Sequence, residues 1–308
     1  MAEAGLSAAF AALDAAGIEF AFRKGSARGH EPPPGGEVDI ALERSHLPSA
    51  DAALTGAGFN VYSAPGHGAH RFYLAFSSGR WLKIDARLEG GPPRSVRRLA
   101  ARRPAGSRRL GPVVAVVGPD GAGKGTVIAR LAEEIPVETK VLYLGWRKKD
   151  GVRQAKERNA RPGPLLEAAF VVKGWLRAVL ILLGGYGSAW RGAIVLCDRH
   201  PVEGLAVRPR QSALGHRLES FLLSRLTPWP DAVVVLDAPT EVLVARKPEH
   251  PRGVIERWRG AYAETFGRRG GVLVSSAGAL DATVARASAV VWDALRRRRR
   301  WNQPRASL

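Results

Sequence analysis

The stretch VVAVVGPDGAGKGTVIARL, residues 113–131, constrains the fold of this chain more than any other segment does. A run of apolar residues is followed by G-x-x-x-x-G-K, which ends at Lys124, and then by an apolar-periodic helix. Glycines let backbone N–H groups curl around phosphate oxygens, and the start of the helix adds partial positive charge beneath them. The stretch therefore predicts a phosphate-binding loop, in which Lys124 neutralises the β- and γ-phosphates of a nucleotide.

The residues around this loop are the predicted ATP-binding residues. They are Gly118, Asp120, Gly121, Ala122, Gly123, Lys124, Gly125 and Thr126. The general motif places Ser or Thr directly after the lysine, where its hydroxyl ligates Mg²⁺. Here Gly125 stands at that position and the hydroxyl comes one residue later, at Thr126. We keep Thr126 as a candidate metal ligand.

Short apolar runs alternate with helical patterns through the second half of the chain. The predicted strands are 113–117, 141–144, 193–197, 232–236 and 271–275. Runs such as VVAVV and AVVVL suit strands buried on both faces, which favours a parallel sheet wrapped by helices. The sequence thus predicts an α/β domain over residues 112–295, with a five-stranded parallel sheet.

The apolar stretch LLEAAFVVKGWLRAVLILL, residues 165–183, raises the question of a membrane span. Glu167, Lys173 and Arg177 interrupt it, so no run reaches the ~18 uncharged residues that a span needs. We expect a core or amphipathic helix that ends at Gly184-Gly185, with contact at a membrane surface as the remaining alternative.

Beyond the loop, several motifs resemble those of nucleoside monophosphate kinases. GKGT is similar to adenylate kinases and GPDGAGK to thymidylate kinases, while IVLCDRH (194–200) is similar to the Asp-Arg-Tyr motif of the latter, with His200 in place of tyrosine. The segment from Pro230 to Arg252 resembles the strand and arginine-bearing lid that follow in that family. The resemblance implies phosphoryl transfer that depends on ATP and Mg²⁺.

The same resemblance implies roles for individual residues. Lys124, Asp198, Arg199 and Arg246 would be catalytic: Asp198 would position metal-bound water, Arg199 would bridge the donor and acceptor phosphates, and Arg246 would close from the lid together with Lys247 and Arg252. Asp120 would contact the acceptor nucleotide. The expected cofactors are ATP and Mg²⁺, and a dimer would fit the family.

The acceptor is less well defined by the sequence. The Arg-Glu-Pro-Gly segment of thymidylate kinases is replaced by YLGWRKKDG, and their Tyr-Gln signature is missing from RHPVEGLAVRPR. A nucleoside monophosphate is the leading hypothesis. The alternatives are another small molecule, such as a sugar or an antibiotic, or a basic nucleic-acid-binding protein in which the loop acts as an ATP-controlled switch.

Residues 1–92 predict a smaller α+β domain. We expect helices over Leu6–Ala16 and Leu47–Gly58, strands over Ile18–Arg23 and residues 36–43, and a hairpin over residues 71–89 with its turn at Ser77-Ser78-Gly79. His67 and His70 are expected to be solvent-exposed.

Three carboxylates give this first domain a candidate metal site. Glu37 and Asp39 are two apart on a predicted strand, so they point to the same side, and Asp85 lies on a later strand. Together with the Gly25-Ser26 turn, they resemble the minimal nucleotidyltransferase fold, which implies metal binding by the acids and triphosphate binding by the turn. An active nucleotidyltransferase, a degenerate copy that binds nucleotide or a partner, and ordinary surface carboxylates all remain open.

Basic charge is concentrated outside these two domains. The formal net charge is +19; seven arginines fall in the linker 93–111 and six in the tail 296–308, with no acid in either. These segments are either solvated or contact an anionic polymer or membrane surface. The single cysteine, Cys197, and the absence of a basic, apolar leader fit a cytoplasmic protein.

Overall fold

The computed structural model describes residues 5–62, 69–90, 111–144, 163–207 and 212–300. Nearly all of the arginine-rich linker and residues 301–308 of the basic tail lie outside this described part. Both alternatives for these segments, solvation or contact with an anionic polymer or membrane, therefore stay predictions.

The first domain is a five-stranded mixed sheet with two helices. Its elements are α1 (Leu6–Ala15), β1 (Phe20–Phe22), β2 (Val38–Glu43), η1 (Arg44–His46), α2 (Leu47–Gly56), β3 (Asn60–Tyr62), β4 (His70–Ser77) and β5 (Arg80–Glu89). The strand order is β1-β2-β5-β4-β3, and only β2 and β5 are parallel neighbours. The predicted helices and hairpin are confirmed, whereas the short strand β3 was not expected.

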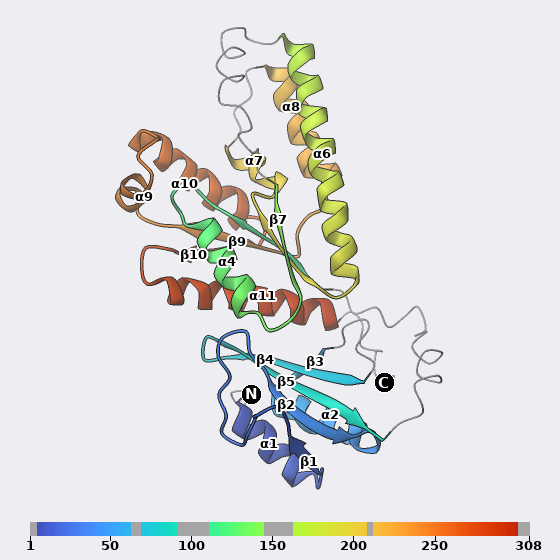
Figure 1. Ribbon diagram of the computed structural model, residues 1–308. Coiled ribbons are helices and arrows are strands. Elements are labelled where there is room, and N and C mark those ends of the chain that lie inside the picture. Colours follow the sequence, from blue (N-terminus) through green and yellow to red (C-terminus); the bar gives the residue numbers. More distant parts are fainter. Residues whose placement is uncertain (1–4, 63–68, 91–110, 145–162, 208–211, 301–308) are drawn as a thin grey trace.

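Strand β4 is buried on both of its faces, which explains how the two domains pack together. Tyr73 and Ala75 belong to the core beneath α1 and α2, whereas Phe72 and Leu74 belong to a core shared with the second domain. In that shared core, the rings of Trp81 and Trp292 meet edge to face with their centroids 5.6 Å apart. The sheet therefore lies against α11, the helix between the two domains in Figure 1.

The second domain confirms the predicted five-stranded parallel sheet. Its strands are β6 (Val113–Val117), β7 (Thr139–Tyr143), β8 (Ile194–Asp198), β9 (Ala232–Asp237) and β10 (Val272–Ser275), in the order β10-β9-β6-β8-β7. Its helices and helical turns are α4 (Lys124–Glu134), α6 (Pro164–Trp190), η3 (Pro201–Glu203), α7 (Gly204–Val207), α8 (Ala213–Phe221), η4 (Leu222–Leu226), α9 (Thr240–Arg246), α10 (Arg252–Gly267) and α11 (Leu280–Arg300). Helix α11 runs five residues past the predicted domain end at 295.

The central strand β6 shows why the uninterrupted apolar runs of the sequence form strands that are buried on both faces. All five of its residues are buried. Val114 and Val116 pack in the cluster that includes residues of α4 and α11, and Ala115 and Val117 pack in another cluster with Tyr262 and Phe266 of α10. Helices therefore cover both faces of the sheet, as an uninterrupted apolar strand requires.

The prediction that Gly184-Gly185 ends the helix is wrong, because α6 continues to Trp190. A Cβ atom at Gly185 would lie 2.4 Å from Leu142 Cδ1 of β7. The glycine thus lets the helix lie close against the sheet, and this packing outweighs its low helix propensity. None of the helices in the described part of the chain is both long and apolar enough to cross a membrane.

Candidate functional site

The phosphate loop lies at the carboxyl edge of the parallel sheet, directly after β6. Gly118, Gly121 and Gly123 have φ angles of 148°, 87° and 81°, a region that side-chain-bearing residues rarely adopt. A Cβ atom at Gly118 would lie 2.3 Å from Leu236 O of β9. The glycines are therefore required both by the curl of the loop and by its close approach to the neighbouring strand.

Lys124 is the first residue of α4 and folds back onto the loop. It is only 7% exposed, and its Nζ donates hydrogen bonds to Gly118 O at 2.6 Å and Pro119 O at 3.0 Å. Burial lowers the pKa of Lys124, and the nearby charge of Glu203 opposes this shift most strongly. A bound phosphate would stabilise the ammonium further, because it brings negative charge into a poorly solvated place.

Asp120 is contacted by side chains from distant parts of the chain. Its carboxylate accepts hydrogen bonds from Arg199 at 2.8 Å and Lys247 at 3.1 Å, and His250 Nε2 lies 3.7 Å away. Burial alone would raise the pKa of Asp120, but Arg199, Lys247 and Lys124 outweigh it and lower this pKa to about 2. The contacts thus bring together the loop, the Asp-Arg motif and the segment after α9.

Asp198, the last residue of β8, stands in register with Val116 just before the loop. Its Oδ1 atom is buried and has no hydrogen-bond partner among the described residues. Burial raises the pKa of Asp198, although Lys124 and Arg199 pull it back. A buried carboxylate oxygen without a partner suits a hard cation or its bound water, so the residues here fit Mg²⁺. Thr126, the other candidate metal ligand of this domain, is exposed in the first turn of α4.

Glu203, which the sequence analysis did not single out, is a further carboxylate of this site. It is buried, and its Oε1 accepts a hydrogen bond of 2.5 Å from the Tyr262 hydroxyl. Its charge favours the protonated forms of Lys124 and Arg199. The one signal for it was an acid placed five residues after Asp198. His200 is also buried, and burial lowers its pKa to about 3, so it is neutral.

The predicted lid residues differ in what they contact. Lys247 reaches Asp120, whereas Arg246 donates to Ser276 O at 2.9 Å. Arg252 forms ion pairs with Glu241 and Glu256. The structure therefore brings Lys124, Asp120, Arg199 and Lys247 together and places Arg246 elsewhere; its proposed closure over a bound nucleotide stays a prediction.

A pocket of about 280 Å³ lies between α7, α8 and α10. It is lined by Gly204, Leu205, Ala206, Val207, His216, Glu219, Ser220, Leu223, Arg257, Trp258 and Ala261. The Trp258 ring also contacts the ring of His250, with centroids 4.7 Å apart, and His250 in turn lies beside Asp120. The pocket is thus linked to the phosphate loop through two aromatic side chains.

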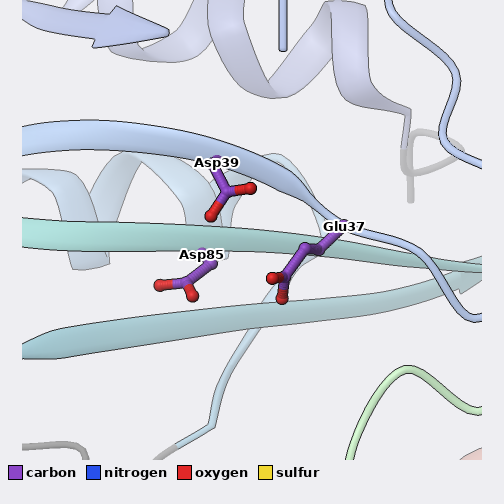
Figure 2. Close-up of side chains that lie close together, drawn as sticks. All are labelled: Glu37, Asp39 and Asp85. Atoms are coloured by element: carbon purple, nitrogen blue, oxygen red, sulfur yellow. The ribbon is translucent and has the colours of Figure 1, made fainter. Parts of the chain in front are cut away.

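In the first domain, the three predicted carboxylates do lie together (Figure 2). One ligand oxygen from each of Glu37, Asp39 and Asp85 lies within 4.8 Å of the others, because β2 and β5 are neighbours with Asp39 opposite Asp85. Each acid also has a partner that carries nitrogen: Lys83 at 2.5 Å from Glu37, Lys24 at 2.9 Å from Asp39, and His70 Nδ1 at 2.7 Å from Asp85. The expectation that His70 is simply solvent-exposed is wrong.

The Gly25-Ser26 turn stands next to these acids. Lys24 and Gly25 have φ angles of 49° and 75°, so the chain turns sharply after β1. Ser26 Oγ accepts a hydrogen bond from the Asp39 backbone N–H at 3.0 Å. The turn is therefore fixed against the start of β2, where two of the acids lie.

A glycine-rich phosphate loop lies at the carboxyl edge of a parallel sheet, and an Asp-Arg pair lies at the end of β8, the neighbouring strand in that sheet. Together they define a P-loop phosphotransferase. The chain is 33% identical to the adenylate kinase of Deinococcus radiodurans over 153 residues, which are 49% of this chain and 67% of that enzyme. It belongs to the nucleotide kinase family that includes this adenylate kinase. No protein-family model matches the chain.

Solved kinase structures are also similar to it at low identity. Thymidylate kinase from Candida albicans is 14% identical, with a TM-score of 0.46 over 60% of this chain and 92% of that one. Deoxyadenosine kinase from M. mycoides is 13% identical, with a TM-score of 0.41 over 58% of this chain and 97% of that one.

Proposed function

We propose that this chain transfers the γ-phosphoryl group of ATP to a nucleoside monophosphate. The observation that carries the proposal is the convergence of Lys124, Arg199 and Lys247 around the phosphate loop, where Asp120 is their shared anionic partner. Phosphoryl transfer spreads negative charge over the equatorial oxygens, and such cations stabilise it. A phosphate acceptor is already anionic, so the transfer needs no strong general base.

In the proposed reaction, each side chain has a role that its contacts support. Arg199 and Lys247 exchange the Asp120 carboxylate for phosphate oxygens, and Lys124 exchanges the two loop carbonyls for the far end of the triphosphate. Asp198 and Thr126 are the residues to hold Mg²⁺, Asp198 through water. A bound Mg²⁺ would neutralise charge on the phosphates. Glu203, which accepts a hydrogen bond from Tyr262, favours the charged form of Lys124.

The base and sugar of the acceptor would bind in the pocket between α7, α8 and α10. Trp258 offers an aromatic surface, and Ser220, Glu219 and Arg257 offer polar groups to a base and sugar. Binding sites for small molecules commonly combine apolar walls with a few polar groups.

The test is ADP release by the purified protein with ATP, Mg²⁺ and each nucleoside monophosphate in turn. We expect at least one monophosphate to raise turnover well above the rate without acceptor. If none does, and a sugar or another hydroxylated compound does, the acceptor assignment is wrong while the kinase assignment stands.

The first domain favours a second candidate function, nucleotidyl transfer. It rests on the cluster of Glu37, Asp39 and Asp85 beside the fixed Gly25-Ser26 turn. Three carboxylates within reach of one another suit the divalent metal ions that this chemistry uses. A metal ion would have to displace Lys83, Lys24 and His70 from the acids, and a degenerate copy of the site would retain those pairs.

Asp39→Asn is expected to abolish nucleotidyl transfer and to leave phosphorylation unchanged, because Asp39 lies in the first domain and the phosphate loop in the second. The measurement is release of pyrophosphate and of ADP by the same preparation. Asp14→Asn, on an exposed carboxylate of α1, is the matched control. Loss of both activities in Asp39→Asn would show that the domains do not act independently.

A further inference from the structure

Helix α6 has an exposed apolar face that the kinase site does not use. Of the fifteen exposed large apolar side chains in the described chain, eight are on α6 and three on the neighbouring α8 and η4. Those on α6 are Leu165, Leu166, Phe170, Val172, Leu176, Leu180, Leu183 and Trp190. Isolated exposed apolar residues are common, but such a concentration on three adjacent elements is typical of an interaction surface.

These residues form one face because of their spacing along the helix. Leu176, Leu180 and Leu183 follow one another at intervals of four and three, so they lie on one side. Lys173 lies seven residues from both Leu166 and Leu180, and is therefore on the same side. Figure 1 shows α6 at the outer edge of the second domain.

The α8–η4 segment is bound to α6 at both ends. The Trp175 indole donates to Thr227 Oγ1 at 3.0 Å, and the Ser212 backbone N–H donates to Glu167 at 3.0 Å. Exposed Leu214, Phe221 and Leu226 therefore extend the apolar surface of α6 onto the neighbouring elements.

The charged residues of these elements are divided by sign. Their two acids, Glu167 and Glu219, are both buried. Their four strong bases, Lys173, Arg177, Arg217 and Arg225, are all exposed. Throughout α6, α8 and η4, which the structure describes completely, the solvent thus meets apolar and positively charged groups without an exposed carboxylate.

We propose that α6, with α8 and η4, binds the surface of an anionic lipid bilayer, a function beyond the proposed phosphoryl transfer. The leucines and aromatic rings would enter the boundary between headgroups and acyl chains, and the lysine and arginines would extend to lipid phosphates. Charge selects this partner, because a second copy of the chain would add four more cations to the contact and no exposed acid.

The experiment is flotation of the full chain with phosphatidylcholine vesicles, with and without phosphatidylglycerol. We expect binding to the anionic vesicles only, weakened by salt. The double variant Leu180→Glu, Leu183→Glu is expected to lose at least tenfold in binding. Replacing Lys173 and Arg177 by glutamine should weaken binding to the anionic vesicles about fivefold for each charge removed. Circular dichroism and ADP release show that each variant is folded.

Leu273→Glu is the matched control, because Leu273 is 58% exposed on β10, close to the 60% of Leu180. It should bind vesicles as the wild type does. Equal vesicle binding by the Leu180, Leu183 double variant and the wild type would overturn the proposal and assign the binding to the arginine-rich segments. A dimer in solution that this variant dissociates, with no vesicle binding by the wild type, would also overturn it.

Discussion

Lys124→Ala is expected to lower kcat/KM for phosphoryl transfer by about 30- to 1,000-fold. Loss of one well-placed charge-stabilising group typically costs about 2–4 kcal/mol of transition-state stabilisation, and each 1.36 kcal/mol is about tenfold in rate. Lys124 is buried, donates hydrogen bonds to two loop carbonyls and lies 3.9 Å from an oxygen of Asp120, so alanine at this position removes a positive charge from the loop itself. Steady-state ADP release, with the best monophosphate, measures the effect.

Arg130→Ala on the same helix is the control for this variant. Arg130 pairs with Glu134 and Asp281 on the surface, and exposed ion pairs contribute little to stability. We expect it to keep near wild-type turnover. If Lys124→Ala also kept wild-type turnover while folded, the loop would not be the phosphoryl-transfer site.

Asp198→Asn is expected to lower activity by about 10- to 100-fold and to raise the Mg²⁺ concentration needed for half-maximal rate. Outer-shell groups that orient a metal typically have effects of this size. The substitution keeps the shape of the side chain and removes its charge at the buried oxygen that lacks a partner among the described residues. Titration of Mg²⁺ at saturating ATP separates this effect from a loss of nucleotide binding.

Asp237→Asn is the matched control for Asp198, because Asp237 ends the strand on the other side of β6. Its carboxylate is held by Arg259 through hydrogen bonds of 2.7 and 2.8 Å. We expect this change to lower thermal stability and to leave the Mg²⁺ requirement unchanged. The same Mg²⁺ shift in both variants would show that Asp198 has no specific role with the metal.

Features that depend on local sequence were predicted well. The five parallel strands follow from apolar runs that need cover on both faces, and the phosphate loop follows from glycines whose φ angles only glycine adopts readily. The acid cluster of the first domain was found because residues two apart on a strand share a side. In each case, the pattern itself contains the physical constraint.

Features that depend on distant contacts were missed or mispredicted. Gly185 looked like a helix end, and its role is set by Leu142 on another element. Glu203 was not singled out, because its partner Tyr262 lies far along the chain. His70 gave no sign of its partner, because Asp85 lies across a strand pair. These pairings arise only when the tertiary fold is formed.

The most direct test of the central claim is a calorimetric titration of ATP with Mg²⁺ into the folded wild-type protein and the Lys124→Ala variant. The loop around residues 118–126 should bind ATP in the wild type, and the loss of the lysine should weaken that affinity clearly. A folded wild-type sample without measurable affinity for ATP in the presence of Mg²⁺ would contradict the assignment of a phosphate-binding loop.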